Sequence, residues 1–239
     1  MNASTSGRDL SRIVPPELAG RLAARGRQLA VTAGQVVIAS GHVSRDVYLV
    51  REGAMRTALF AASGREVVIR DIPAGELFGE LAALDGQPRA STVVAATDAR
   101  LTILSAEDFV AAVTEDPIAA LWLLRRFSGM VRVLTEKIFE LSALPVRTRL
   151  HCELLRMAEE GIETEEGILL SPAPTHADLA ARVGSHREMV TREFSYMAEA
   201  GMLRQNGRKL VLLNLALLMR EIQRVSGGND RQAQGVALA

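Results

Sequence analysis

The spacing of apolar positions changes character along this chain of 239 residues. Pro15-Pro16 opens a short segment whose pattern predicts a helix to about Arg27. From Val31 to about Thr102, short β-branched and apolar runs then alternate with glycines; clear examples are 35–38, 46–50, 55–59 and 66–70. Many short runs bounded by turn residues predict a small β-sandwich or barrel.

From Asp116 onward the apolar period becomes helical. Alternating spacings of three and four residues mark one side: Leu124, Phe127, Val131, Leu134, Ile138 and Leu141. This spacing predicts a long helix with an a/d seam. A second apolar flank is formed by Leu123, Met130 and Val133. A helix that is apolar on two sides needs two neighbours, here the β-domain of the same chain and a helix of a partner chain. The alternative is one broad core-facing stripe in a monomer. Pro145 ends or restarts the helix.

Two short helices joined by a tight turn are predicted near residue 184. Thr175 is positioned to cap a first helix that runs to Val183, and Gly184 ends it in a left-handed conformation. Ser185 and Glu188 have the spacing of a capping box, which predicts that a second helix opens at once. This arrangement is typical of a helix-turn-helix.

The second helix and the segment after it carry positive charge. Arg187, Glu188, Thr191 and Arg192 fall on one side of the helix at spacings of three and four. After Gly201, residues 202–212 predict a β-hairpin with a type I′ turn at Asn206-Gly207. Its basic side chains are Arg204, Arg208 and Lys209. An Arg-rich helix alone is usually a solvated surface, but this combination favours a winged reader of DNA.

Charge is balanced overall but not locally. Lys plus Arg equals Asp plus Glu, 28 − 28 = 0, so total charge does not indicate nucleic acid. Residues 182–209 hold six basic and three acidic side chains, 6 − 3 = +3. The acidic segment 159–167 is expected to be a solvated connection, with the basic face opposite it.

Few other chemistries are indicated. The one cysteine, Cys152, lies in an apolar helical stretch and is expected to be a buried, inert thiol. We find no nucleophile–base pair, metal set or Walker loop, so no enzyme is predicted. The first nine residues lack the apolar region of a signal peptide, and no run of 18 apolar residues is free of charge. A cytoplasmic protein without a membrane partner is therefore expected.

The remaining motif is Phe78-Gly79-Glu80-Leu81-Ala82, followed by Pro88-Arg89-Ala90-Ser91-Thr92. A loop of this kind can hold a sugar hydroxyl with its Glu and a phosphate with its Arg. The pair resembles the phosphate-binding cassette of cyclic-nucleotide-binding domains. With the helix-turn-helix behind it, the chain resembles the cyclic-AMP receptor protein (CRP/FNR) family of bacterial transcription regulators over almost its whole length.

The resemblance implies an α+β fold with an N-terminal cyclic-nucleotide-binding β-roll (jelly-roll-like), a long dimerisation helix and a C-terminal winged helix-turn-helix. The expected divisions are a flexible N-terminus at 1–12, a sensor domain at 13–115, the helix at 116–144, the DNA-binding domain at 145–225 and a disordered tail at 226–239.

In the sensor, the resemblance assigns Arg89 to the phosphate and Glu80 to the ribose hydroxyl. Gly79, Leu81, Ala90 and Ser91 complete the cassette, and Leu134 and Thr135 of the long helix meet the base. Two positions depart from the bacterial pattern: Ala90 stands where the receptor has Ser, and Leu134 replaces one of two hydroxyl contacts. Cyclic AMP is the expected ligand, with cyclic GMP as the alternative. A ligand-independent regulator with a vestigial pocket is the alternative function.

For the reader, the resemblance implies a homodimer on double-stranded DNA, cytoplasmic and nucleoid-associated, with RNA polymerase as a further partner. The DNA-binding residues expected are Ser185, Arg187, Glu188, Thr191, Arg192, Arg208 and Lys209. A dimer with two-fold symmetry requires a palindromic site, expected to be similar to TGTGA in each half.

Overall fold

The computed structural model describes residues 12–62 and 66–226. The terminal segments expected to be flexible therefore lie almost wholly outside the described residues. The chain forms two compact units that divide between Val133 and Leu134, within the long helix. Each unit is described by itself below.

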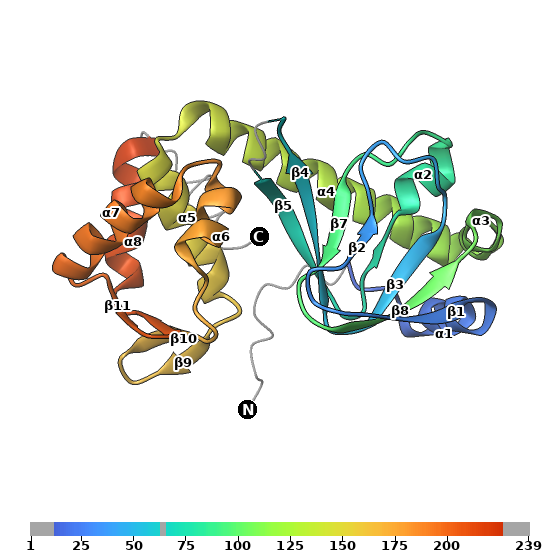
Figure 1. Ribbon diagram of the computed structural model, residues 1–239, viewed down its shortest axis with the longest axis horizontal. Helices are drawn as coiled ribbons and strands as arrows, with labels where there is room; N and C mark the ends of the chain where they lie inside the picture. Colours follow the sequence, from blue (N-terminus) through green and yellow to red (C-terminus); the bar gives the residue numbers. More distant parts are fainter. Residues whose placement is uncertain (1–11, 63–65, 227–239) are drawn as a thin grey trace. The chain divides into compact units, whose positions relative to one another are not determined.

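The N-terminal unit is built on two antiparallel sheets, as the closely spaced apolar runs predicted (Figure 1). One sheet has the strand order β1-β8-β3-β6 and the other has β2-β7-β4-β5. The strands are β1 (Arg27–Val31), β2 (Val36–Ile38), β3 (Val47–Glu52), β4 (Ala54–Phe60), β5 (Glu66–Pro73), β6 (Leu77–Phe78), β7 (Thr92–Ala95) and β8 (Ala99–Leu104). Non-consecutive neighbours make this a roll rather than a meander, which confirms the predicted jelly-roll-like class.

Side chains from both sheets meet in one core. Alternate residues of a strand point to opposite faces, so each strand contributes every second side chain to this layer. Tyr48 of β3 and Phe78 of β6 stack there with their ring centroids 4.9 Å apart. Other members are Val31, Ile38, Val50, Met55, Ile72, Val93, Ala95, Ala99, Leu101 and Ile103. This core fixes β6, and with it the start of the Phe-Gly-Glu motif.

Helices cover the outer face of the sheet that contains β3. They are α1 (Pro16–Arg25), α2 (Glu80–Asp85), α3 (Ala106–Thr114) and the long α4 (Pro117–Ala143). Their apolar sides form a second core with β3, β6 and β8, in which Leu22, Phe109 and Trp122 are buried. The indole Nε1 of Trp122 also donates a hydrogen bond to the carbonyl oxygen of Ile13.

The two apolar sides predicted for the long helix have different environments. Leu123 of the second flank is buried in the sensor core. On the a/d seam, Leu124 and Val131 are each 63% exposed and Ile138 is 65% exposed. Phe127 has seam spacing but is half-buried against the sensor core, so it is less exposed than its neighbours on the seam. The helix therefore carries an apolar stripe that the residues described in the structure leave largely uncovered.

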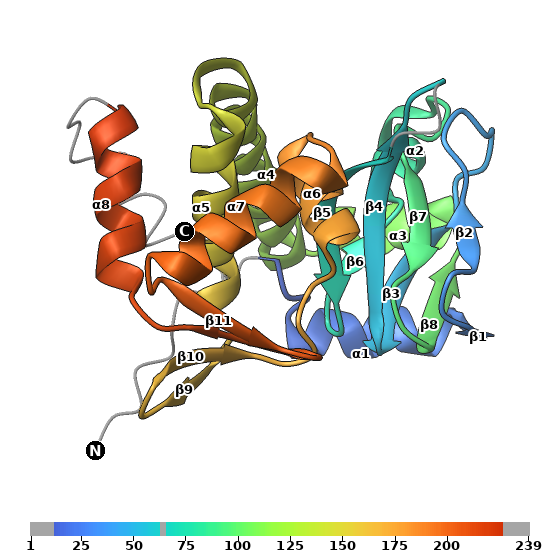
Figure 2. The ribbon, with the colours of Figure 1, turned by 60° about the vertical axis from the view of Figure 1, so that its left-hand side comes forward.

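The C-terminal unit packs helices against one small sheet (Figure 2). Its sheet has the order β11-β12-β10-β9. The elements are α5 (Val146–Ala158), β9 (Ile162–Thr164), β10 (Gly167–Leu170), α6 (His176–Val183), α7 (Arg187–Glu199), β11 (Leu203–Asn206), β12 (Lys209–Leu212) and α8 (Leu215–Ser226). Pro145 is the N-cap residue of α5, as expected of a proline that restarts a helix. The core of the unit contains Leu154, Leu179, Val190, Met197 and Leu218.

Two expectations for this unit need correction. The acidic segment is largely exposed, as expected of a solvated connection, but it forms a β-hairpin and not a loop, because β9 pairs with β10 and Thr164 lies opposite Gly167. Only three residues form β9, and all are exposed, so no apolar alternation announced it. In the wing, Asn206 pairs with Lys209, which leaves Gly207-Arg208 as the turn. Gly207 alone has positive φ, +57°. Glycine at the first central position is typical of a type II′ turn, not of the predicted type I′ turn.

Candidate functional site

Gly79 forms the bend that brings the cassette together. It follows β6 directly and adopts a left-handed conformation, with φ +88°. A Cβ at this position would lie 2.8 Å from the carbonyl oxygen of Asp46 and 2.9 Å from Nη1 of Arg89. Glycine is therefore required by both the dihedral angle and the close approach of Arg89. The sequence analysis placed Glu80 in a loop. In the structure, Glu80 is instead the first residue of α2.

Arg89 is buried beside this bend, with only 3% of its surface exposed. Its Nη1 donates to the carbonyl oxygen of Gly79 at 2.8 Å, its Nη2 to that of Asp46 at 2.7 Å, and its Nε to Oγ of Ser44 at 3.0 Å. Three of the five guanidinium N–H groups are thus used, and 5 − 3 = 2 remain. Burial lowers the pKa of Arg89, against the opposing charges of Tyr48, Asp46 and Glu80. The guanidinium is held in a fixed orientation with donors left for an anion.

Glu80 is also buried, with 4% of its surface exposed. Its carboxylate lies 3.7 Å from Nη2 of Arg126, a residue of α4. Sequence reasoning missed Arg126. The available signal was a charged residue between Leu123 and Met130, on the flank of the helix that faces the sensor core.

The main chain of Arg89 and the remaining cassette residues have different environments. The main chain of Arg89 is paired with the 41–42 turn, because its N–H donates to the carbonyl of His42 at 3.0 Å and its carbonyl accepts from Gly41 at 2.8 Å. Leu81 and Ala90 are exposed, and Ser91 is half-buried.

The base-contacting residues expected on the long helix are not in the sensor unit. Leu134 and Thr135 belong to the C-terminal unit, and both are exposed there. Within the sensor unit, the structure therefore brings Gly79, Glu80 and Arg89 together.

The helix-turn-helix has the predicted helices. Oγ1 of Thr175 accepts a hydrogen bond from the main-chain N–H of Asp178 at 3.0 Å, which caps α6. Gly184 ends α6 with φ +62°, and a Cβ there would lie 3.1 Å from Cδ2 of Leu141. The predicted capping box at Ser185 was wrong. The N-cap residue of α7 is His186, whose side chain makes no capping hydrogen bond, and Ser185 is buried in the turn at 9% exposure.

One side of α7 is exposed and the other is buried, as its spacing predicted. The exposed side carries Arg187, Glu188, Thr191 and Arg192, and the buried side carries Val190, Phe194 and Met197. The hydroxyl of Thr191 donates to the carbonyl of Arg187 at 3.0 Å and lies 2.8 Å from Nδ1 of His176. The charged side chains of α7 are therefore more available than this hydroxyl for contacts outside the chain.

Polar contacts from α5 hold α7 in place. Arg147 donates from Nε to Oε1 of Glu193 at 2.7 Å, and Nε2 of His151 lies 3.1 Å from the same oxygen. The guanidinium of Arg147 also lies over the ring of Tyr196, 3.8 Å from its centroid. Burial lowers the pKa of His151, although Glu193 opposes this shift. The orientation of α7 thus depends on contacts of Glu193 with Arg147 and the buried His151, which the sequence analysis did not predict.

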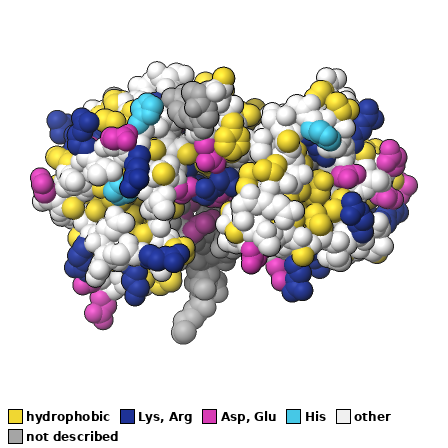
Figure 3. Space-filling view, in the orientation of Figure 1, with side chains coloured by type: hydrophobic (Ala, Val, Ile, Leu, Met, Phe, Trp, Pro, Cys, Tyr) yellow, Lys and Arg dark blue, Asp and Glu magenta, His cyan; other side chains and the backbone are white. Residues whose placement is uncertain are grey.

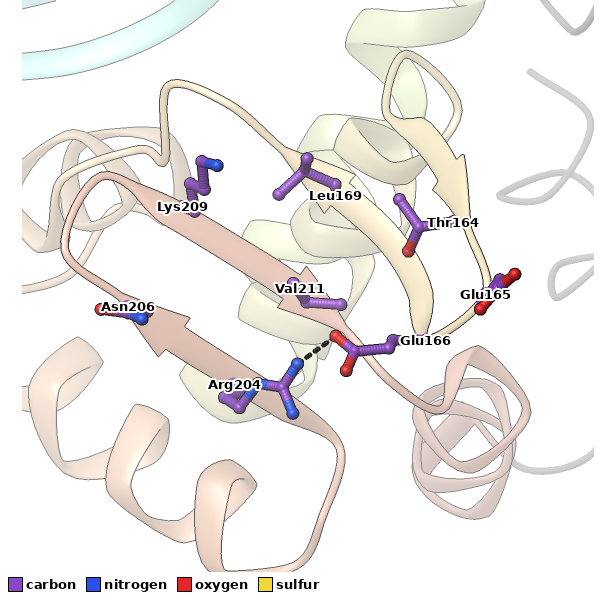
Figure 4. A pocket seen from close by; sticks show the side chains of 8 residues that line it. All are labelled: Thr164, Glu165, Glu166, Leu169, Arg204, Asn206, Lys209 and Val211. Carbon is purple, nitrogen blue, oxygen red and sulfur yellow. Dashed lines mark hydrogen bonds and ion pairs between the residues drawn. The ribbon is translucent and has the colours of Figure 1, made fainter.

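The sequence analysis expected the basic side chains to lie opposite the acidic segment 159–167, but in the sheet of this unit the two lie side by side. Arg204 of β11 forms an ion pair with Glu166, in the turn between β9 and β10 (Figure 4). A shallow pocket lies on this sheet, lined by Thr164, Glu165, Glu166, Leu169, Arg204, Asn206, Lys209 and Val211. The acidic segment therefore lies beside the basic wing and neutralises Arg204, while Arg208 and Lys209 stay exposed.

The face drawn in Figure 3 shows acidic and basic side chains interspersed on both units. Cys152 is a buried free cysteine, as expected, and burial raises the pKa of its thiol to about 12. Among residues 12–62 and 66–226, no helix is long and apolar enough to cross a membrane.

Comparisons with known proteins agree with this organisation. Residues 28–116 match the cyclic nucleotide-binding domain, and residues 148–221 match the Crp-like helix-turn-helix domain. The chain is 31% identical over 189 residues to the cyclic AMP receptor protein of Thermus thermophilus, a match that covers 79% of this chain and 84% of the relative.

Two solved structures are also similar. One is a CRP/FNR-family regulator of Thermus thermophilus, TTHA1359, with 30% identity, a TM-score of 0.68 and coverage of 82% of this chain and 98% of that one. The other is the cyclic di-GMP-responsive global regulator CLP of Xanthomonas campestris, with 22% identity, a TM-score of 0.74 and coverage of 83% and 99%. With both domains matched in the same order, the chain belongs to the cyclic-AMP receptor protein (CRP/FNR) family of transcription regulators.

Proposed function

We propose that this protein is a homodimeric, sequence-specific DNA-binding regulator that responds to a cyclic nucleotide. The observation that carries the ligand response is the fixed guanidinium of Arg89, which is buried beside Glu80 and keeps two N–H groups for an anion.

Cyclic AMP is the ligand that we favour. A relative with 31% identity is named a cyclic AMP receptor protein. In our proposal Arg89 binds the cyclic phosphate and Glu80 accepts the ribose 2′-hydroxyl, while Gly79, Leu81, Ala90 and Ser91 surround them. Leu134 and Thr135 contact the base. Cyclic GMP is the alternative, because Leu134 provides no hydroxyl for discriminating between purines.

The exposed side of α7 supports DNA reading. Arg187 and Arg192 have the length for bidentate contacts with guanine, and Glu188 can accept from a cytosine amino group. Thr191 and Ser185 complete the expected set, with Arg208 and Lys209 of the wing on phosphates. The uncovered stripe on α4 supports dimerisation, and a dimer with two-fold symmetry selects a palindrome, here a TGTGA-like site.

Cellular context follows from this role. We infer a cytoplasmic, nucleoid-associated protein that works with RNA polymerase and has no catalytic activity. The relatives named above are regulators, which supports the inference about catalysis.

One specific observation favours a second function, a regulator that binds DNA without ligand. Ala90 and Leu134 remove hydroxyl groups from positions expected to contact the nucleotide. Titration calorimetry with cyclic AMP, cyclic GMP and cyclic di-GMP, together with DNA-site selection in the presence and absence of each, separates the two functions. Micromolar binding of one cyclic mononucleotide that tightens DNA binding supports the proposal. DNA binding with no response to any of the three would establish the second function instead.

A further inference from the structure

His176 links the two helices of the helix-turn-helix through a hydrogen bond. It is the first residue of α6, and its Nδ1 lies 2.8 Å from Oγ1 of Thr191, in the second turn of α7. The imidazole also packs against the ring of Phe194, with the ring centroids 4.6 Å apart and the planes tilted by 52°. Because Phe194 is buried in the core of this unit, the imidazole is held in a position from which it reaches Thr191.

The direction of this hydrogen bond follows from the proton of the Thr191 hydroxyl. A hydroxyl group has one proton, and Oγ1 of Thr191 donates it to the main-chain carbonyl of Arg187 at 3.0 Å. Toward His176 the hydroxyl can therefore only accept, so Nδ1 of the imidazole carries the proton of that contact. The other ring nitrogen, Nε2, is buried and has no hydrogen-bond partner among the residues that the structure describes. The hydrogen bonding of the imidazole is thus directed at Thr191.

The hydroxyl of Thr191 is thereby occupied, although the side chain is exposed. Because it donates to Arg187, it cannot also donate to an acceptor on a base edge, such as O4 of thymine or N7 of guanine. The side chain has its methyl group left for contact, with one lone pair of the hydroxyl. Thr191 shares the exposed side of α7 with Arg187, Glu188 and Arg192. In the major groove, the apolar group that such a methyl group can meet is the C5-methyl of thymine.

We propose that His176 is a positioning residue for DNA reading, which holds the Thr191 hydroxyl against α7 so that Thr191 recognises a thymine through its C5-methyl group. The inference rests on the proposed function and deepens it, because it adds an apolar contact to the polar contacts proposed for the charged side chains of α7. His176 acts through Thr191 and does not itself touch the DNA.

The test replaces thymidine by 2′-deoxyuridine, which lacks only the C5-methyl group. The full chain is titrated, by fluorescence anisotropy, onto the palindrome that wild type selects, with each thymine replaced in turn at the equivalent positions of both half-sites. At one position, wild type should bind the uracil site roughly 2- to 5-fold more weakly per half-site, the value of one buried methyl group. Thr191→Val keeps a methyl group without the hydroxyl and should retain this preference. Thr191→Ser keeps the hydroxyl without the methyl group and should lose it.

The role of His176 is measured by the same ratio of affinities. His176→Phe keeps a ring against Phe194 but removes the donor, so the Thr191 hydroxyl is free to turn and the preference for thymine should fall. His176→Asn, whose Nδ2 can replace Nδ1 as the donor, should retain the preference. His186→Phe makes the same change at the exposed N-cap of α7 and is the matched control, which should leave the ratio unchanged. His176→Ala removes the same donor and serves if His176→Phe fails to fold.

The outcomes separate the inference from the proposed function. If His176 has a merely structural role, its loss weakens binding to both DNAs equally, and this unchanged ratio would overturn the positioning role. Equal affinity for thymine and uracil sites at every position, or a preference that Thr191→Val abolishes, would overturn the methyl contact while DNA reading by α7 stands. If wild type binds no DNA sequence specifically, the proposed function fails and the inference fails with it.

Discussion

The ammonium group of Lys137 donates a 2.7 Å hydrogen bond to the main-chain carbonyl of Arg182. Lys137 lies two residues after Thr135 on α4, and Arg182 lies in the last turn of α6. Carbonyl groups in the last turn of a helix lack intrahelical partners, and a Lys side chain can satisfy them. The end of the long helix therefore caps the first helix of the DNA-binding motif directly.

Buried ion pairs surround this contact. Nζ of Lys137 lies 3.8 Å from Oε2 of Glu153, whose carboxylate also lies 2.8 Å from Arg156 and 3.4 Å from Arg182. Arg156 continues the chain of contacts to Glu140, at 2.5 Å. The ends of α4, α5 and α6 are thus joined by charges of fixed geometry, which makes their mutual orientation specific.

We expect Lys137→Met to destabilise the C-terminal unit. The change removes the cap on Arg182 and one cation beside Glu153, so the free energy of unfolding should fall by about 1.5–3 kcal/mol, the value of a hydrogen bond to a charged group. Urea denaturation followed by circular dichroism measures this. Arg132→Met, at an exposed position of the same helix, should change the stability little. Equal losses in the two variants would contradict the capping role.

Glu153 should make stability sensitive to acid. Burial alone would raise the pKa of Glu153. The nearby cations Arg156, Lys137 and Arg182 together have a larger, opposite effect, so the pKa of Glu153 lies below its ordinary value. As pH falls, the unfolded state therefore takes up the proton first. The stabilisation is complete above the ordinary Glu pKa of about 4.3 and is lost as pH falls through the lower folded value.

Glu153→Gln cannot titrate at this site, so the acid limb of its melting temperature between pH 7 and pH 3 should be flatter than that of wild type. At pH 7 the variant should be less stable by about 3–5 kcal/mol, because cations are left without their buried partner. Glu160→Gln, at an exposed position of the same segment, is the control. If the melting temperatures of wild type and Glu153→Gln fall in parallel as the pH is lowered, protonation of Glu153 is not a cause of the acid sensitivity.

The elements with strong periodicity could be predicted from sequence. Alternating runs gave the β-roll, and the 3-4 spacing gave α4. The Thr175 cap and Gly184 gave the boundaries of α6, because these local interactions involve residues close in sequence. By contrast, β9 was missed because its three residues are all exposed and its pairing is decided by β10.

The charged interior could not be predicted in the same way. Arg126 and Glu76 meet only when the sensor unit folds, and Lys137 and Glu153 only when the C-terminal unit folds, so spacing along the chain does not identify these partners. Arg204 shows the same limit, since its pairing with Glu166 depends on the four-strand order of the sheet. A charged residue on a core-facing flank indicates that a partner exists, but not which one.

Arg89→Ala should weaken nucleotide binding by roughly 10- to 150-fold, because one charge-assisted hydrogen bond to the phosphate is lost. The structure adds a second expected effect, a lower melting temperature, since Arg89 also bonds Ser44, Gly79 and Asp46. Arg45→Ala removes an exposed cation from the neighbouring loop and should change neither quantity strongly. Calorimetry and thermal melts measure both, and unchanged affinity in Arg89→Ala would remove the phosphate assignment.

Val131→Asp should prevent dimerisation. Val131 is 63% exposed on the apolar stripe of α4, so a partner helix would bury the new carboxylate without a counter-charge. The dimer dissociation constant should rise by roughly 10²- to 10⁴-fold, which corresponds to 3–5 kcal/mol. Arg132→Asp places the same group on the next residue, outside the seam, and should dimerise like wild type. Sedimentation velocity that finds wild type monomeric with nucleotide bound would exclude the seam.

The last prediction separates base reading from phosphate contact. Arg192 lies on the exposed side of α7, where its guanidinium can form a bidentate hydrogen bond with one guanine. Lys209 lies at the start of β12 in the wing. Arg192→Ala should relax the preference at one position of each half-site, with a loss of about 1–3 kcal/mol against the preferred base only. Lys209→Ala should instead weaken all sequences alike and reduce the slope of log K against log salt by about 0.9.

Binding-site selection followed by titrations at several salt concentrations measures both effects, and each variant is the control for the other. The two results have different physical origins, because a base contact is lost only with the correct base, whereas a phosphate contact is present on every sequence. A selected site without two-fold symmetry, or one that Arg192→Ala leaves unchanged, would show that α7 does not read DNA in this way. A salt slope unaffected by Lys209→Ala would place the wing away from the phosphates.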